Sequence, residues 1–70
     1  MPNTYTAVTK KDGDWWIGWI EEIPGVNRQE KTREELLKSL KVTLREALEF
    51  NRREALGAAE ADFSEDRISV

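Results

Sequence analysis

Carboxylates and amines are the main charged groups that could do chemistry in this chain, because its 70 residues include neither histidine nor cysteine. The usual general base, the commonest metal ligand and the thiolate nucleophile are therefore missing. Clustered carboxylates could still bind divalent metal ions, and Glu21 and Glu22 stand side by side after an aromatic run. Consecutive side chains on a strand point to opposite faces, so this pair cannot share a metal ion. The sequence predicts no enzyme, no catalytic residue, and no metal or cofactor site.

Basic side chains suggest a second kind of chemistry, the binding of phosphate or of an acidic partner. Four of them fall within roughly one quadrant of a predicted helix at about 100° per residue: Lys38, Lys41, Arg45 and Arg52. Glu34 and Glu49 lie in the same quadrant, and the chain carries 14 acidic against 11 basic residues, a net charge of −3. We favour a solvated helix face and expect no direct nucleic-acid binding, which generally needs a basic domain or patch.

The stretch Trp15-Trp16-Ile17-Gly18-Trp19-Ile20 predicts a strand with large apolar groups on both faces. Side chains alternate along a strand, so one face takes Trp16, Gly18 and Ile20 and the other takes Trp15, Ile17 and Trp19. A domain this small has material to cover only one side. We therefore expect the face that stays uncovered to be a protein interface. Tryptophan is enriched at binding hot spots, and exposed apolar patches are uncommon on monomers.

Two turns place this strand in an antiparallel sheet. Asp12-Gly13 predicts the centre of a two-residue hairpin turn that pairs Lys11 with Asp14, so a first strand at residues 5–9 sets Thr9 opposite Trp16. Pro24-Gly25 fits a type II turn leading to a third, more polar edge strand at residues 26–31.

A long amphipathic helix follows the sheet. Thr32 and Glu35 form a capping box, in which Thr32 is the N-cap and Glu35 reaches back to the N-cap amide. Leucines and alanines follow at helical spacing, and Gly57 is the expected stop. Residues 58–67 could extend the helix or form a loop; we favour a loop that leads to a short strand at 67–70. The predicted fold class is α+β, a three-stranded antiparallel meander packed on one long helix with a short C-terminal strand.

The small residues Ala7 and Gly18 would let the helix approach one face of the sheet closely. The open face would then carry Val8, Trp15, Ile17 and Trp19, with Glu21 and Glu22 as acids at its rim. The alternative is that the last strand, residues 58–63 or a differently placed helix covers this face.

The order of these features resembles the HicB-type antitoxins of bacterial and archaeal toxin–antitoxin pairs. The resemblance rests on the Tyr-x-Ala-Val strand from Tyr5, the Asp-Gly hairpin, the aromatic second strand, Glu22-Ile23-Pro24-Gly25, and the Thr-Arg-Glu-Glu helix start from Thr32. It covers about two-thirds of the chain. Glu30 stands where many relatives have glycine, and Glu21 where many have proline.

The resemblance implies a partial ribonuclease-H-like core that binds and occludes a HicA-type RNA-cleaving toxin. Ribonuclease H chemistry normally needs an acid within the first strand, and residues 5–9 contain none. Longer relatives add a C-terminal DNA-binding segment; here we expect a single domain, residues 1–70, without it.

We therefore interpret the chain as a cytoplasmic antitoxin that self-associates as a homodimer or higher oligomer and contacts no membrane, since no apolar run approaches about 18 residues. The alternative function is a stand-alone homo-oligomeric structural or regulatory domain without a toxin partner.

Overall fold

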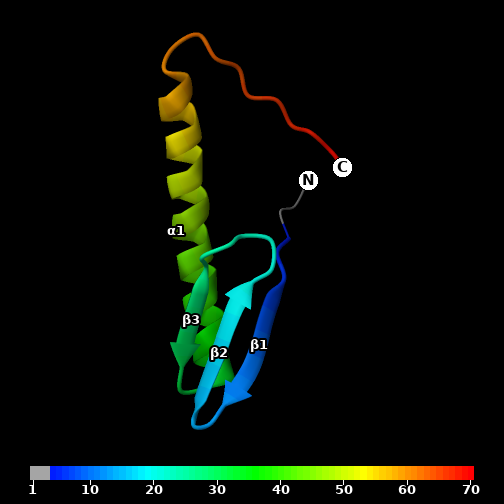
Figure 1. The fold of residues 1–70 in the computed structure, drawn as a ribbon, viewed down its shortest axis with the longest axis vertical. Helices are drawn as coiled ribbons and strands as arrows, with labels where there is room; N and C mark the ends of the chain where they lie inside the picture. The colour runs from blue at the N-terminus through cyan, green and yellow to red at the C-terminus, as the bar shows by residue number, and fades with distance from the viewer. Residues whose placement is uncertain (1–3) are drawn as a thin grey trace.

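The computed structural model describes residues 4–70, which form three strands followed by one long helix (Figure 1). The elements are β1 (Ala7–Asp12), β2 (Trp15–Ile20), β3 (Asn27–Glu30) and α1 (Arg33–Ala59). The strands pair antiparallel in the order β1-β2-β3, and α1 packs across one face of the sheet. The α+β class, the meander and the single long helix are confirmed.

The hairpin between β1 and β2 has a different register from the predicted one. Asp12 pairs with Trp15, and Thr9 lies opposite Gly18 instead of Trp16. The central turn residues are Gly13 and Asp14; Gly13 has φ +62° and Asp14 keeps a negative φ. A positive φ at the first central position alone belongs to a type II′ turn, which takes glycine there. The shift is two residues, so every side chain stays on its predicted face.

The turn between β2 and β3 is formed as predicted. Gly25 has φ +89°, and the Val26 amide donates to the carbonyl of Ile23 at 3.4 Å. The Ile20 amide donates to the Val26 carbonyl at 3.1 Å, which closes the loop against the end of β2. The third strand is shorter than predicted, four residues from Asn27 to Glu30.

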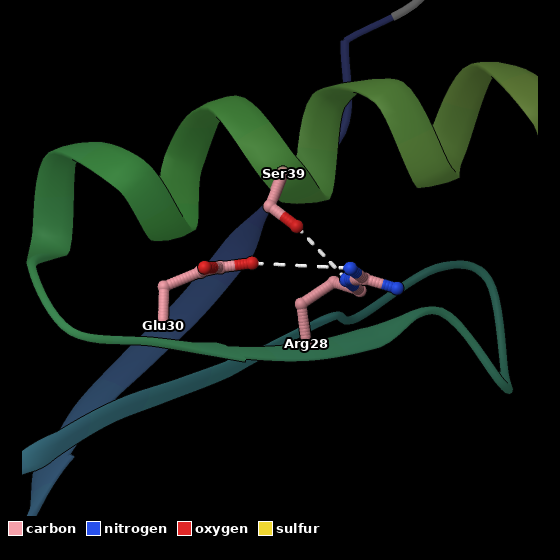
Figure 2. A network of polar contacts seen from close by, with 3 residues as sticks. All are labelled: Arg28, Glu30 and Ser39. Atoms are coloured by element: carbon pink, nitrogen blue, oxygen red, sulfur yellow. Dashed lines mark hydrogen bonds and ion pairs between the residues drawn. The ribbon is translucent and has the colours of Figure 1, made fainter.

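Arg28 ties β3 to the helix, as Figure 2 shows. Its Nε donates to Ser39 Oγ at 2.8 Å, and its Nη2 lies 3.8 Å from Glu30 Oε2. On an edge strand a charged side chain such as Arg28 can discourage uncontrolled pairing with another chain. Its guanidinium instead turns back toward α1, because Arg28 lies opposite Gly18 on the helix-covered face.

Both ends of α1 depart in detail from the predicted signals. Thr32 is the N-cap, and its hydroxyl oxygen accepts the Glu35 amide hydrogen at 3.1 Å. The Glu35 carboxylate accepts the Thr32 hydroxyl at 3.0 Å rather than binding the Thr32 amide, so half of the capping box is formed. The predicted stop at Gly57 is wrong: the helix continues to Ala59, and Glu60 takes the positive φ of 60°.

The core lies where α1 crosses β2 and the start of β3. Among residues 4–70, four hydrophobic side chains are buried: Ile20, Val26, Leu36 and Leu40. Gly18 permits the close approach, since a Cβ atom there would lie 3.1 Å from methyl groups of Leu36 and Leu40. The prediction that the helix covers the face of Gly18 is confirmed.

The helix is longer than the sheet it covers. Its 27 residues span about 40 Å, whereas a six-residue strand spans about 20 Å. The half of α1 that follows Ala47 therefore projects past the sheet, and the longest dimension of the molecule is 51 Å (Figure 1).

Residues 60–70 form neither helix nor strand, so the loop is present and the predicted strand at 67–70 is not formed. Arg52 Nη2 lies 3.5 Å from Glu65 Oε2, an exposed ion pair between α1 and this tail. Within residues 4–70, no helix is long and apolar enough to cross a membrane.

Candidate protein-interaction surface

The face of the sheet opposite α1 carries the apolar groups that the sequence predicted. We call Val8, Trp15, Ile17 and Trp19 the aromatic face. Val8 lies directly across from Trp19 in the register of β1 and β2, and Val8 and Ile17 are half-buried. Trp15 and Trp19 remain 38% and 40% exposed, because α1 packs on the other side. These four side chains form one continuous patch that nothing in residues 4–70 covers completely.

Polar side chains border the aromatic face along β3 and at the hairpin end. Lys31 Nζ lies 4.3 Å from the centre of the Trp15 ring, a cation–π contact that orients the indole. Asn27 and Gln29 pair with Trp19 and Ile17 across the strands. A shallow groove of about 350 Å³ runs here between β2 and β3, lined by Ile17, Gly18, Trp19, Asn27, Arg28 and Gln29. An apolar side chain of a partner would find a concave seat beside Trp19.

The two predicted rim acids have different environments. Glu22 accepts two hydrogen bonds from Thr6: the backbone amide donates to Oε1 at 2.8 Å and the hydroxyl to Oε2 at 2.7 Å. The backbone hydrogen bond chiefly, and then the hydroxyl, lower the pKa of Glu22 below its ordinary value. This carboxylate fastens the β2–β3 loop to the start of β1, whereas Glu21 is exposed and makes only a backbone bond to Thr6.

A second apolar feature, which was not predicted from the sequence, lies on the helix. Val42 and Phe50 are 55% and 59% exposed, although both lie well inside the ends of α1. A hollow of about 610 Å³ lies beside Phe50 and is lined by Arg45, Glu46, Glu49, Phe50 and Arg53. The signal was available: Val42 and Phe50 fall outside the leucine stripe, which alone was used to find the buried face.

The other chemical groups remain apart. No cluster of three or more acidic side chains that could hold a metal ion occurs in the part of the chain that the structure describes. Lys38, Lys41, Arg45 and Arg52 are all exposed, and Arg52 is paired with Glu65.

No family model, no curated protein and no solved structure matches this chain.

Proposed function

We propose that this chain is a cytoplasmic HicB-like antitoxin core, without enzymatic activity of its own, that binds a HicA-type toxin through the aromatic face. The observation that carries the proposal is the uncovered patch of Val8, Trp15, Ile17 and Trp19, which α1 leaves open. The order of the Asp-Gly hairpin, the Glu-x-Pro-Gly turn and the capped helix supports the family. The antitoxin acts by occlusion, burying the catalytic surface of the toxin.

The aromatic face suits such a partner in shape and chemistry. The Trp15 and Trp19 rings supply large, rigid contact areas, and the groove beside Trp19 accepts a side chain from the toxin. Glu21 extends into solvent at the end of β2, and the chain carries a net charge of −3. These charges steer an RNA-binding, basic toxin toward the surface and affect the association rate more than the affinity.

The fold that we propose for the bound state adds the C-terminal strand. β1 is an edge strand with one side unpaired, and the sequence at 67–70 has β-forming residues. From the end of α1, residues 60–66 can extend about 23 Å, which is comparable to the distance by which α1 overhangs the sheet. Pairing of residues 67–70 with β1 would complete a partial ribonuclease-H-like unit.

Co-expression with the neighbouring small open reading frame tests the function directly. A stable complex with a product that is toxic when expressed alone is the expected result, and light scattering then gives its stoichiometry. Trp19→Ala should weaken this complex by about 2–4 kcal/mol, or roughly 30- to 1000-fold in Kd. Phe50→Ala, which truncates an exposed aromatic residue on α1 outside the aromatic face, is the control and should leave toxin affinity unchanged. Intact neutralisation by the Trp19 variant would contradict the assignment of the face.

The second candidate function is a stand-alone homo-oligomeric structural or regulatory domain. It is favoured by the small core, since only four side chains are buried in the described residues and domains of this size often gain stability by association. A homo-oligomer with no toxic neighbour would support this function and leave the toxin proposal without a partner.

A further inference from the structure

We infer that two copies of this chain associate through the projecting part of α1, as an antiparallel helix pair centred on Phe50. This inference goes beyond the proposed function, because it assigns the second copy to a surface separate from the aromatic face. Self-association and toxin binding would then occur together instead of competing for Trp15 and Trp19.

The pairing surface is one exposed stripe along α1, which we call the helix stripe. At about 100° per residue its members fall within an arc of about 100°: Val42, Glu46, Glu49, Phe50, Arg53 and Gly57. Most of the stripe faces away from the side of α1 that carries the buried Leu36 and Leu40, and Phe50 lies past the part of α1 that packs on the sheet. Two large apolar groups, Val42 and Phe50, therefore stand in solvent among charges.

The charges of the helix stripe are complementary to a second copy in only one orientation. When two helices run antiparallel with the two-fold axis between positions 49 and 50, Glu46 of each copy faces Arg53 of the other. Val42 then faces Gly57, and the two Phe50 rings meet beside the axis. The open depression of about 610 Å³ beside Phe50, lined by residues of α1 alone, lies next to this contact. The same two-fold axis brings the two Glu49 side chains beside each other, each paired with Arg53 of its own helix at 3.5 Å.

A parallel pair lacks this match. It would place Glu46 against Glu46 and Arg53 against Arg53, and like charges in direct opposition are unfavourable. Antiparallel pairing also separates the two sheets, because each sheet covers the first half of its own helix and the projecting half of α1 rises past it (Figure 1).

The accessible surface area of the molecule is larger than that of a compact monomer of the same mass, as a subunit without its partner would show. Its accessible surface is 6014 Å², against about 4500 Å² for a compact monomer of 8.1 kDa. Its radius of gyration is 15.1 Å, against about 11 Å for a compact chain of this length. The projecting part of α1 and the exposed residues 60–70 both contribute to this excess of about 1500 Å², and a standard interface buries about 800 Å² on each partner.

Sedimentation equilibrium at low ionic strength tests the inference with a charge-swap series. The wild-type chain should be a dimer, and Phe50→Glu should weaken dimerisation by at least about a hundred-fold. Glu46→Arg and Arg53→Glu alone each create two like-charge contacts and should weaken it about ten-fold, whereas the double variant should return to within about three-fold of wild type. Lys41→Glu, exposed on another side of α1, is the control and should leave the dimer intact.

Cysteine crosslinking separates the two orientations, since the chain has no cysteine of its own. In the antiparallel pair the two copies of position 50 are about 1.5 Å apart along the helix axis, and those of position 42 are about 22 Å apart. Phe50→Cys should therefore form a disulfide-linked dimer under mild oxidation and Val42→Cys should not, since a disulfide spans at most about 7 Å between Cα atoms.

Four outcomes would overturn the inference: a wild-type monomer at the highest soluble concentration, a dimer insensitive to Phe50→Glu, a double variant as weak as the singles, or equal crosslinking at positions 42 and 50. Circular dichroism of each variant checks that α1 is retained. If Trp19→Ala abolishes the dimer and Phe50→Glu does not, self-association occurs through the aromatic face instead. Toxin binding by either variant is scored separately, so each proposal can fail alone.

Discussion

Replacing Gly18 with alanine tests how closely α1 lies on the sheet, because the added Cβ atom enters the space between β2 and the helix. That atom would lie 2.9 Å from the carbonyl oxygen of Val8 and 3.1 Å from methyl carbons of Leu36 and Leu40. The two methyl groups can rotate away by a few tenths of an ångström. The Val8 carbonyl belongs to the backbone of β1, so relieving that contact requires the strand itself to move.

The expected loss of stability follows from two opposing effects. Overpacking a well-filled site costs about 1–3 kcal/mol. Alanine also restricts the unfolded chain more than glycine does, which returns about 0.4–1 kcal/mol. The net change for Gly18→Ala is a destabilisation of about 1–2 kcal/mol. In a domain of this size, that lowers Tm by about 5–15 °C.

Urea unfolding followed by tryptophan fluorescence and circular dichroism measures this change. Gly57→Ala is the matched control: a Cβ atom there has no neighbour within 4 Å, and Gly57 lies inside α1. Alanine at this position should stabilise the protein by up to about 1 kcal/mol. A Gly18→Ala variant as stable as the wild type would refute the close packing of α1 on β2 and the small core built on it.

Three further predictions concern the helix, the core and the loop. Thr32→Ala should lower the free energy of unfolding by about 1 kcal/mol in urea titrations, because the Glu35 amide loses its acceptor at 3.1 Å, and an unchanged midpoint would contradict the cap. Leu40→Ala should cost about 2–5 kcal/mol and leave much of the chain unfolded, whereas exposed Val42→Ala should change stability little. The hydrogen bonds from Thr6 lower the folded-state pKa of Glu22, so its carboxylate stabilises the fold above the unfolded-state pKa and that contribution is lost as pH falls through the lowered value. Glu22→Gln should therefore reduce the loss of stability between neutral pH and about pH 3, and identical pH profiles for the two proteins would show that the contact with Thr6 is not formed in solution.

Local signals in the sequence predicted most of the fold. Alternation in 15–20 assigned Trp19 to the open face and Gly18 to the covered one, because strand periodicity does not depend on the partner strand. The Pro24-Gly25 turn and the Thr32 cap were predicted for the same reason: each is determined by the backbone preferences of two to four neighbouring residues.

The hairpin register and the end of α1 were predicted wrongly, because each depended on a choice between adjacent positions of similar propensity. The Asp12-Gly13-Asp14 segment can form either of two two-residue turns, and pairing of the whole strand selects the one with Gly13 first. At the C-terminal end of α1, Gly57 was a possible stop, but continuing the helix to Ala59 added hydrogen bonds. The residue with positive φ that ends the helix is therefore Glu60.

The aromatic face and the helix stripe also differ in how much of each the sequence determines. The sequence by itself determined that Trp15, Ile17 and Trp19 share one face, since that follows from side-chain alternation alone. Helical spacing places Val42 and Phe50 outside the leucine stripe, but only the tertiary structure decided how far along α1 the sheet extends and that Phe50 lies past its end. That limit is set by the contact of Gly18 with Leu36 and Leu40, residues brought together from distant parts of the chain. Periodicity along one segment carries no information about contacts between residues that are far apart in the sequence.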